Sequence, residues 1–151
     1  MTTIVTKAHF SQPPDVVFSY VTTPSNWPKW HPSSLKVEGS GADHSALAGE
    51  VVVEQFHVSG RRGEVTWRVV KRDEPTYWRI DGVITGRSNG GSISYRLKPA
   101  ADGGTDFDRT FTYPTPGVWF TLADWLFVRG RVKSESGRAL KQLGHQLDQL
   151  E

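Results

Sequence analysis

The chain has 151 residues, with 18 basic and 16 acidic side chains, no cysteine, one methionine and six tryptophans. This length fits a single domain, residues 1–151, with a core large enough to form without disulfide bonds. The absence of cysteine excludes disulfides and thiolate chemistry, and a net charge of +2 is too small to predict nucleic-acid binding.

The N-terminal part of the chain predicts one strand followed by two short helices. Residues 2–10 are rich in β-branched side chains, which is typical of a strand. Pro13 and Pro14 fit the first turn of a helix that continues to Val21. The three prolines within 23–32 restrict the next segment to a turn or a second short helix.

The middle of the chain has the pattern of an antiparallel meander. Apolar, β-branched and aromatic runs predict strands at 35–38, 50–58, 64–72, 76–85, 91–98 and 105–113. The connections 60–63, 73–75, 86–91 and 101–104 are short enough for hairpins, and 39–49 is a longer loop.

A long amphipathic helix is expected from Gly117 to the C-terminus. Its apolar stripe follows steps of three and four residues: Val132, Ser136, Leu140, Leu143, Leu147 and Leu150. A helix of this length would span ~50 Å, so we expect a bend or break near 129–131. Gly130, Gly137 and Gly144 share one flank, which suggests close approach of backbone or ligand there, or a coincidence.

These elements predict an α+β fold, in which a curved antiparallel sheet of six or seven strands wraps around the C-terminal helix. The short helices would close one end, and a cavity is expected between sheet and helix. The N-terminus has no signal-peptide pattern, and the longest purely apolar run, 125–128, is far too short for a membrane span. We therefore expect a cytoplasmic protein without membrane insertion.

Arg109 is the most informative position, because alternation places it inward between Phe107 and Phe111. A buried guanidinium is costly unless it is paired. Arg109 therefore either meets a protein carboxylate such as Glu54, or reaches water, or binds an anionic group of a ligand. The two explanations within the protein are the more frequent ones for a buried arginine.

The strand 50–58 is ambiguous, because Val53 and His57 share one side while Glu54 and Phe56 share the other. If its His57 side faces inward, His57 could join Arg109 as an acid or base; otherwise it is an exposed histidine beside a turn. The other histidines are scattered without metal-ligand spacing, so we expect no metal and no cofactor.

Several aromatic residues could serve either the core or a pocket. Trp27 and Trp30 would line an entrance or seal the core, and the aromatic residues around Trp119 would form a gate or a dimer surface. We expect a monomer or a weak homodimer. The candidate ligand-binding residues are Trp27, Trp30, Val53, Trp67, Trp78, Ile80, Tyr95, Arg109, Phe111, Trp119, Leu122 and Leu126.

Four sequence motifs resemble the polyketide cyclase/dehydrase and lipid-transport group of the START-like superfamily: 13–18 (PPDVVF), 24–32 (PSNWPKWHP), 95–99 (YRLKP) and 103–105 (GGT). The resemblance covers essentially the whole chain. It implies a helix-grip fold with a hydrophobic cavity between sheet and C-terminal helix. Members of this group include aromatic cyclases, lipid and sterol carriers, plant hormone binders and coenzyme Q-binding proteins. They share no catalytic motif, so the resemblance predicts fold rather than activity.

Two functions follow as hypotheses. The first is a binding protein for a hydrophobic small molecule, such as a lipid, an isoprenoid or an aromatic polyketide, and it ranks first because few titratable groups face inward. The alternative is a cyclase or dehydratase, in which Arg109 stabilises an enolate and His57 or Tyr95 moves a proton. A protein that acts through an exposed aromatic patch at the start of the last helix is a third hypothesis.

Overall fold

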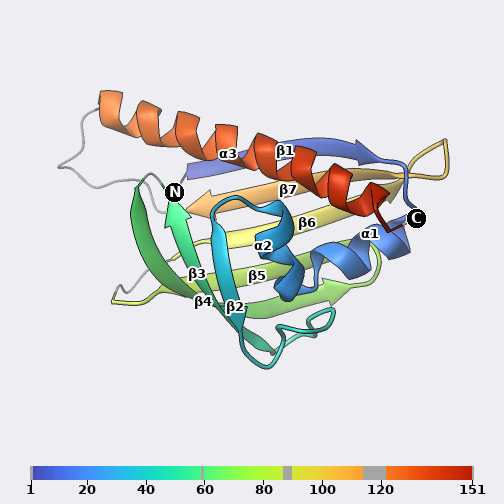
Figure 1. The fold of residues 1–151 in the computed structure, drawn as a ribbon, viewed down its shortest axis with the longest axis horizontal. Helices are drawn as coiled ribbons and strands as arrows, with labels where there is room; N and C mark the ends of the chain where they lie inside the picture. Colours follow the sequence, from blue (N-terminus) through green and yellow to red (C-terminus); the bar gives the residue numbers. More distant parts are fainter. Residues whose placement is uncertain (1, 59, 87–89, 114–121, 151) are drawn as a thin grey trace.

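The computed structural model describes residues 2–58, 60–86, 90–113 and 122–150, in which one curved sheet wraps around a long helix (Figure 1). The helical elements are α1 (Pro14–Val21), the 3-10 turn η1 (Pro24–Asn26), α2 (Trp27–Trp30) and α3 (Leu122–Asp148). The strands are β1 (Thr2–Phe10), β2 (Ser34–Glu38), β3 (Val51–Val58), β4 (Arg61–Asp73), β5 (Tyr77–Ile84), β6 (Ser92–Pro99) and β7 (Thr105–Tyr113). The predicted α+β helix-grip fold is confirmed.

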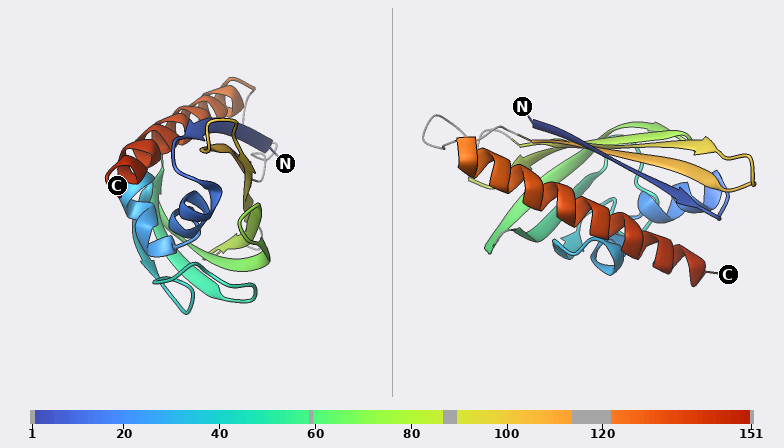
Figure 2. Two further views of the ribbon diagram at one scale, coloured as in Figure 1. Left: turned by 90° about the vertical axis from the view of Figure 1, so that its right-hand side faces the viewer. Right: turned by 90° about the horizontal axis from the view of Figure 1, so that it is seen from above.

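The sheet is an antiparallel meander that the first strand completes. The strand order is β1-β7-β6-β5-β4-β3-β2, so β1 pairs with the last strand, from Thr2 opposite Tyr113 to Phe10 opposite Thr105. Seen along its length, the sheet curls around a central axis, with α3 on one side and α1 filling one end (Figure 2). This arrangement places α3 and the short helices against the inward face.

Two strand details differ from the sequence prediction. β4 begins at Arg61 rather than at 64, because Arg61 pairs with Val58 and only residues 59 and 60 connect the strands. A register shift between Val69 and Lys71 then changes the phase of β4. Strict alternation would point Arg72 outward, but it lies opposite Trp78, with its guanidinium 5.3 Å from the centre of the Phe18 ring.

Helix α3 continues through Gly130 without the expected break. Close approach of backbone along its glycine flank does not occur at Gly130 and Gly137, where an added Cβ would meet nothing within 4 Å. At Gly144 an added Cβ would lie 3.6 Å from the Phe10 ring, which is ordinary contact. Packing of the buried stripe holds the helix instead. None of the helices that the structure describes is long and apolar enough to cross a lipid bilayer.

The core is a chain of aromatic rings at the end of the sheet covered by α1 and α2. Trp78 stacks on Tyr95 with ring centroids 5.5 Å apart, and the edge of Trp27 meets Trp78 at 6.2 Å. Tyr95 also contacts Phe107, which contacts Phe10. The indole nitrogens of Trp27 and Trp78 donate to backbone carbonyls, each at 3.1 Å. These residues form a densely packed half of the interior.

A surface histidine on β1 gives the protein a predictable pH response. His9 lies between two carboxylates, with Nε2 2.8 Å from Asp102 and Nδ1 3.0 Å from Asp106. Hydrogen bonds that the His9 ring donates to Asp106 and Asp102 raise the pKa of His9 above its usual value. Because folding favours the protonated ring, the stabilisation is complete below about pH 6.5 and is lost as pH rises through the folded-state pKa.

We therefore expect the Tm advantage of the native protein over His9→Asn to shrink between about pH 5 and about pH 9. NMR titration of the His9 ring would report its pKa directly, and Asp102→Asn should lower that pKa. A pKa at or below the usual histidine value, or a Tm difference that grows with pH, would contradict this prediction.

Candidate functional site

Arg109 lies on the inward face of β7 and is only 2% exposed. Its strand neighbours are Tyr95 on β6 and Thr6 on β1. Nη1 donates to Ser136 Oγ of α3 at 3.1 Å, and Nη2 lies 3.3 Å from Nε2 of His31, the residue after α2. None of the ion pairs among the described residues includes Arg109. A side-chain hydrogen bond also joins Arg109 to Tyr95. The guanidinium therefore has neutral partners and no carboxylate within ion-pair distance in this part of the chain.

His31 is uncharged. Burial, with the charge of Arg109 acting in the same direction, lowers the pKa of His31 to about 3. Its Nε2 faces the Arg109 guanidinium. Its Nδ1 lies 2.7 Å from Ser33 Oγ and 3.3 Å from the Ser33 backbone nitrogen, which donates to it. His31 thus orients Arg109 without adding a second positive charge.

Glu54 on β3 is a carboxyl group that faces the interior. Its Oε1 accepts a hydrogen bond from Trp67 Nε1 at 3.0 Å. Burial raises the pKa of Glu54, while Ser34, Trp67 and the charge of Arg109 act in the opposite direction. Burial likewise raises the pKa of the Tyr95 hydroxyl to about 12. The site therefore combines a buried cation with a carboxyl group that is harder to ionise than usual.

Several polar atoms around Arg109 are buried and have no hydrogen-bond partner. They include Arg109 Nε itself and Oγ1 of its strand neighbour Thr6. A third is Nε1 of Trp30, whose ring lies beside the rings of His31 and Tyr95. An unsatisfied buried polar atom costs roughly 1–3 kcal/mol. Such atoms in one region indicate a place for polar groups of a bound molecule.

Inward-facing side chains are fully buried on one side of Arg109 and partly exposed on the other side. Along β7, Phe107 is 0% exposed, whereas Phe111 and Tyr113 are partly exposed although they face inward. Inward-facing side chains also become partly exposed toward the ends of β5 and β3, at Ile84 and Phe56. These two strand ends lie at the same end of the sheet. We call this region, lined by Phe56, Ile84, Phe111 and Tyr113, the open end. It lies away from α1 (Figure 1).

The structure brings most of the candidate residues to the inward face. Trp67, Trp78, Ile80, Tyr95, Arg109 and Phe111 all face the interior. Trp27 and Trp30 are buried behind them, where Trp27 contacts Trp78 and Trp30 contacts Tyr95. Trp119 and the side chains of Leu122 and Leu126 lie outside the described part of the chain.

The structure shows which side of the ambiguous strand β3 faces inward, and it is not the side of His57. Val52 is 1% exposed and lies opposite Trp67, so Val52, Glu54 and Phe56 form the inward side. Val53 and His57 therefore face outward, and His57 is exposed. His57 and Arg109 lie on opposite faces of the sheet, so the postulated His57–Arg109 pair does not occur.

Sequence reasoning named Glu54 as a possible partner of Arg109, but it missed the contacts of Arg109 with Ser136 and His31. Ser136 had a signal, because it is the one hydroxyl residue in the apolar stripe of the last helix. Glu54 had a partial signal, since it alternates with Val52 and Phe56, but the face of its strand was undecided. His31 had none, because its contact with Arg109 joins residues 78 positions apart.

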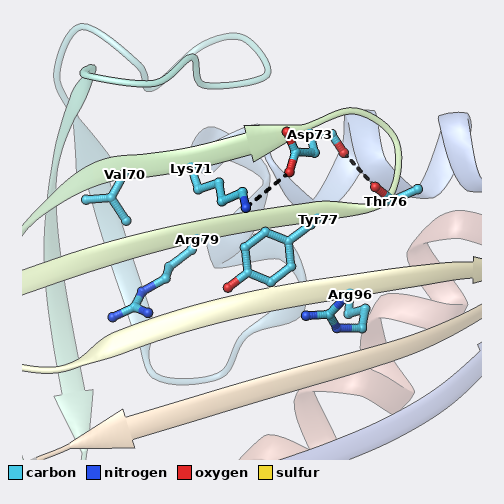
Figure 3. A pocket seen from close by; sticks show the side chains of 7 residues that line it. All are labelled: Val70, Lys71, Asp73, Thr76, Tyr77, Arg79 and Arg96. Carbon is cyan, nitrogen blue, oxygen red and sulfur yellow. Dashed lines mark hydrogen bonds and ion pairs between the residues drawn. The ribbon is translucent and has the colours of Figure 1, made fainter.

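A separate hollow lies on the outward face of β4, β5 and β6 (Figure 3). At its centre the Tyr77 ring lies between Arg96, 4.9 Å from the ring centroid, and Lys71, 5.6 Å from it. Lys71 also pairs with Asp73 at 3.6 Å. These side chains are at least partly exposed, so solvent satisfies them, and the unsatisfied groups that indicate a site are those around Arg109.

Comparison with known proteins agrees with this architecture. A family model described as polyketide cyclase / dehydrase and lipid transport matches residues 1–148. A relative, Penitrem biosynthesis cluster 1 protein I of Penicillium ochrochloron, is 33% identical over 104 residues, which are 66% of this chain and 67% of the relative.

Solved structures share the fold along nearly the full chain. The Zhui aromatase/cyclase from a Streptomyces species gives a TM-score of 0.75 at 16% identity, over 97% of this chain and 93% of that one. The protein TTHA0849 from Thermus thermophilus gives 0.81 at 13% identity over 99% of both chains, and Ara h 8.0201 gives 0.65 at 22% over 97% of both. These identities establish the fold alone. Since the family model spans nearly all of the sequence, the chain belongs to the polyketide cyclase/dehydrase and lipid-transport family of the START-like superfamily.

Proposed function

We propose that the protein binds a largely apolar small molecule between the sheet and α3, with its body at the open end and a polar group at Arg109. The ligand classes that fit are lipids, isoprenoids and aromatic polyketide-like molecules. One observation carries the proposal: inward-facing apolar side chains stay partly exposed next to a buried arginine whose Nε has no partner. A bound molecule would cover the exposed apolar side chains and accept a hydrogen bond from Arg109 Nε.

The test is a ligand screen of fatty acids, sterols, quinones and flavonoids, with native mass spectrometry of the purified protein for co-purified molecules. A class of ligand that binds should raise the Tm of the protein and perturb the NMR signals of Phe111 and Tyr113. If no class binds and no ligand co-purifies, the proposed function is wrong.

A pair of neighbouring residues tests where the ligand binds. Ile84 faces the open end and Val83 faces outward on the same strand, 51% exposed. Ile84→Trp should fill the space and weaken binding about tenfold or more, a change of ~1.4 kcal/mol or greater. Val83→Trp should leave the affinity unchanged. Equal affinities for the two variants in calorimetric titrations would place the ligand elsewhere.

The alternative function is a cyclase/dehydratase-type enzyme in the same interior, and the raised pKa of Glu54 favours it. In a dehydration, the α proton of a β-hydroxy ketone is lost to solvent, and Arg109 stabilises the enolate. The protonated form of Glu54, which burial favours, donates a proton to the departing hydroxyl, which leaves as water, and Glu54 then regains a proton from solvent. This scheme uses Glu54 in place of His57.

Loss of that proton donor should slow turnover far more than it weakens binding. With an aromatic β-hydroxy ketone that yields an ultraviolet-absorbing enone, we expect Glu54→Gln to reduce kcat by about 100-fold or more. KM should change little, and Gln55→Ala, on the outward side of β3, should match the native protein. A native rate no faster than buffer, or an unchanged rate in Glu54→Gln, would exclude this role.

A further inference from the structure

We infer that the interior selects hydrophobic monoanions, and that Arg109 holds the ligand as its carboxylate, phenolate or enolate form. This inference rests on the proposed function and adds the chemical class of the ligand. Three features of the described residues support it: the charge balance of Arg109, the lack of a protein carboxylate bonded to it, and the single charge and apolar surroundings that the site offers.

The first feature is the charge balance of Arg109. The side chain is almost fully buried, and its partners Ser136 Oγ and His31 Nε2 are neutral. A side-chain hydrogen bond also joins Arg109 to the hydroxyl of Tyr95, while Nε–H has no partner among the described residues. An oxyanion can therefore take further hydrogen bonds from the guanidinium, and it would supply the missing negative charge.

The second feature is that no neighbouring group replaces this anion. Glu54 bonds to Trp67 instead, forms no ion pair with Arg109, and is itself harder to ionise than usual. Tyr95, the strand neighbour of Arg109, stays neutral at physiological pH because burial raises its pKa to about 12. Glu54 interacts with the charge of Arg109 without forming an ion pair with it, so an anionic ligand group would be the first direct ionic partner of the guanidinium within the part of the chain that the structure describes.

The third feature sets the number of charges and the nature of the ligand body. His31 stays neutral, so Arg109 itself offers one positive charge, which matches a single anionic group, while Arg129 acts farther along, on Tyr113 at the open end. The guanidinium lies 5.5 Å from the centre of the Phe111 ring, where the apolar open end begins. A ring system or alkyl chain attached to the anionic group would extend along this surface.

Two matched ligand series test the inference by calorimetry at about pH 7, where carboxylic acids are ionised. The first is 2-naphthoic acid, 2-naphthylmethanol and methyl 2-naphthoate, and the second is dodecanoic acid, dodecanol and methyl dodecanoate. In at least one series we expect the acid to bind about tenfold or more tightly than its alcohol and ester. Arg109→Gln should remove this preference, and Arg79→Gln, on the outward face, should retain it.

A second measurement uses only the native protein, so it does not depend on the folding of a variant. The carboxyl carbon of bound, ¹³C-labelled acid should titrate at lower pH than that of free acid, because Arg109 favours the anion. Neutral analogues that bind as tightly as the acids, or a bound acid with an unchanged pKa, would overturn the inference and leave the proposed function intact. If none of the six probes binds, the inference is also overturned. The proposed function fails only if no ligand of the wider screen binds either.

Discussion

Trp78→Ala is expected to lower the free energy of unfolding by about 3–5 kcal/mol, the range for removal of a fully buried tryptophan. The Trp78 side chain is 0% exposed, stacks on Tyr95 and meets the edge of Trp27. Its loss would leave a cavity and would also remove the hydrogen bond to the Ala46 carbonyl. Urea denaturation followed by circular dichroism measures the change.

The matched control is Tyr77→Ala, the preceding residue on the same strand. Tyr77 faces outward, is partly exposed, and contacts the cations of Lys71 and Arg96 through its ring. Exposed cation–π contacts contribute roughly 0.5–1 kcal/mol each, so we expect a loss of about 1–2 kcal/mol. Equal losses for the two variants would contradict the assignment of Trp78 to the core.

The fold was predictable because most strands carry an unambiguous alternation. β7 has apolar residues on one side only, and β5 has charged residues on one side, Arg79 and Asp81, so Phe107 and Ile80 could be placed inward from sequence alone. β3 could not be assigned, since valines occur on both sides, and only its pairing with β4, which sets Val52 opposite Trp67, decides its face. The bulge after Val69 was equally invisible, because a register shift depends on the partner strand.

The sequence predicted the central residue of the candidate site, Arg109, but not the residues that contact it. Arg109 could be identified because it is a charged residue within an inward apolar pattern. Its hydrogen-bond partners come from other elements, with Ser136 on α3 and His31 after α2. Such contacts depend on how the helices dock on the sheet, which a periodic pattern does not encode. The open end depends on the same docking.

The second large effect concerns Arg109→Met, for which stability and ligand binding should change in opposite directions. A buried charge without a counter-ion opposes folding, and replacing buried ionic groups with apolar ones of similar volume is often neutral or stabilising by roughly 1–4 kcal/mol. Methionine also removes the unpaired Nε–H. We therefore expect ligand-free Arg109→Met to unfold at an equal or higher urea concentration, while its affinity for the carboxylic acids falls at least about tenfold.

Refolding both proteins from denaturant before the comparison removes any co-purified ligand, which would otherwise stabilise the native protein through Arg109. Arg72→Met provides the contrast, because Arg72 is partly buried yet pairs with Glu74 at 3.1 Å and bonds to Ser45. That variant should lose stability. If Arg109→Met instead lost about 3–5 kcal/mol, as expected when one partner of a buried ion pair is removed, Arg109 would already have its counter-ion within the protein. The requirement for an anionic ligand would then disappear.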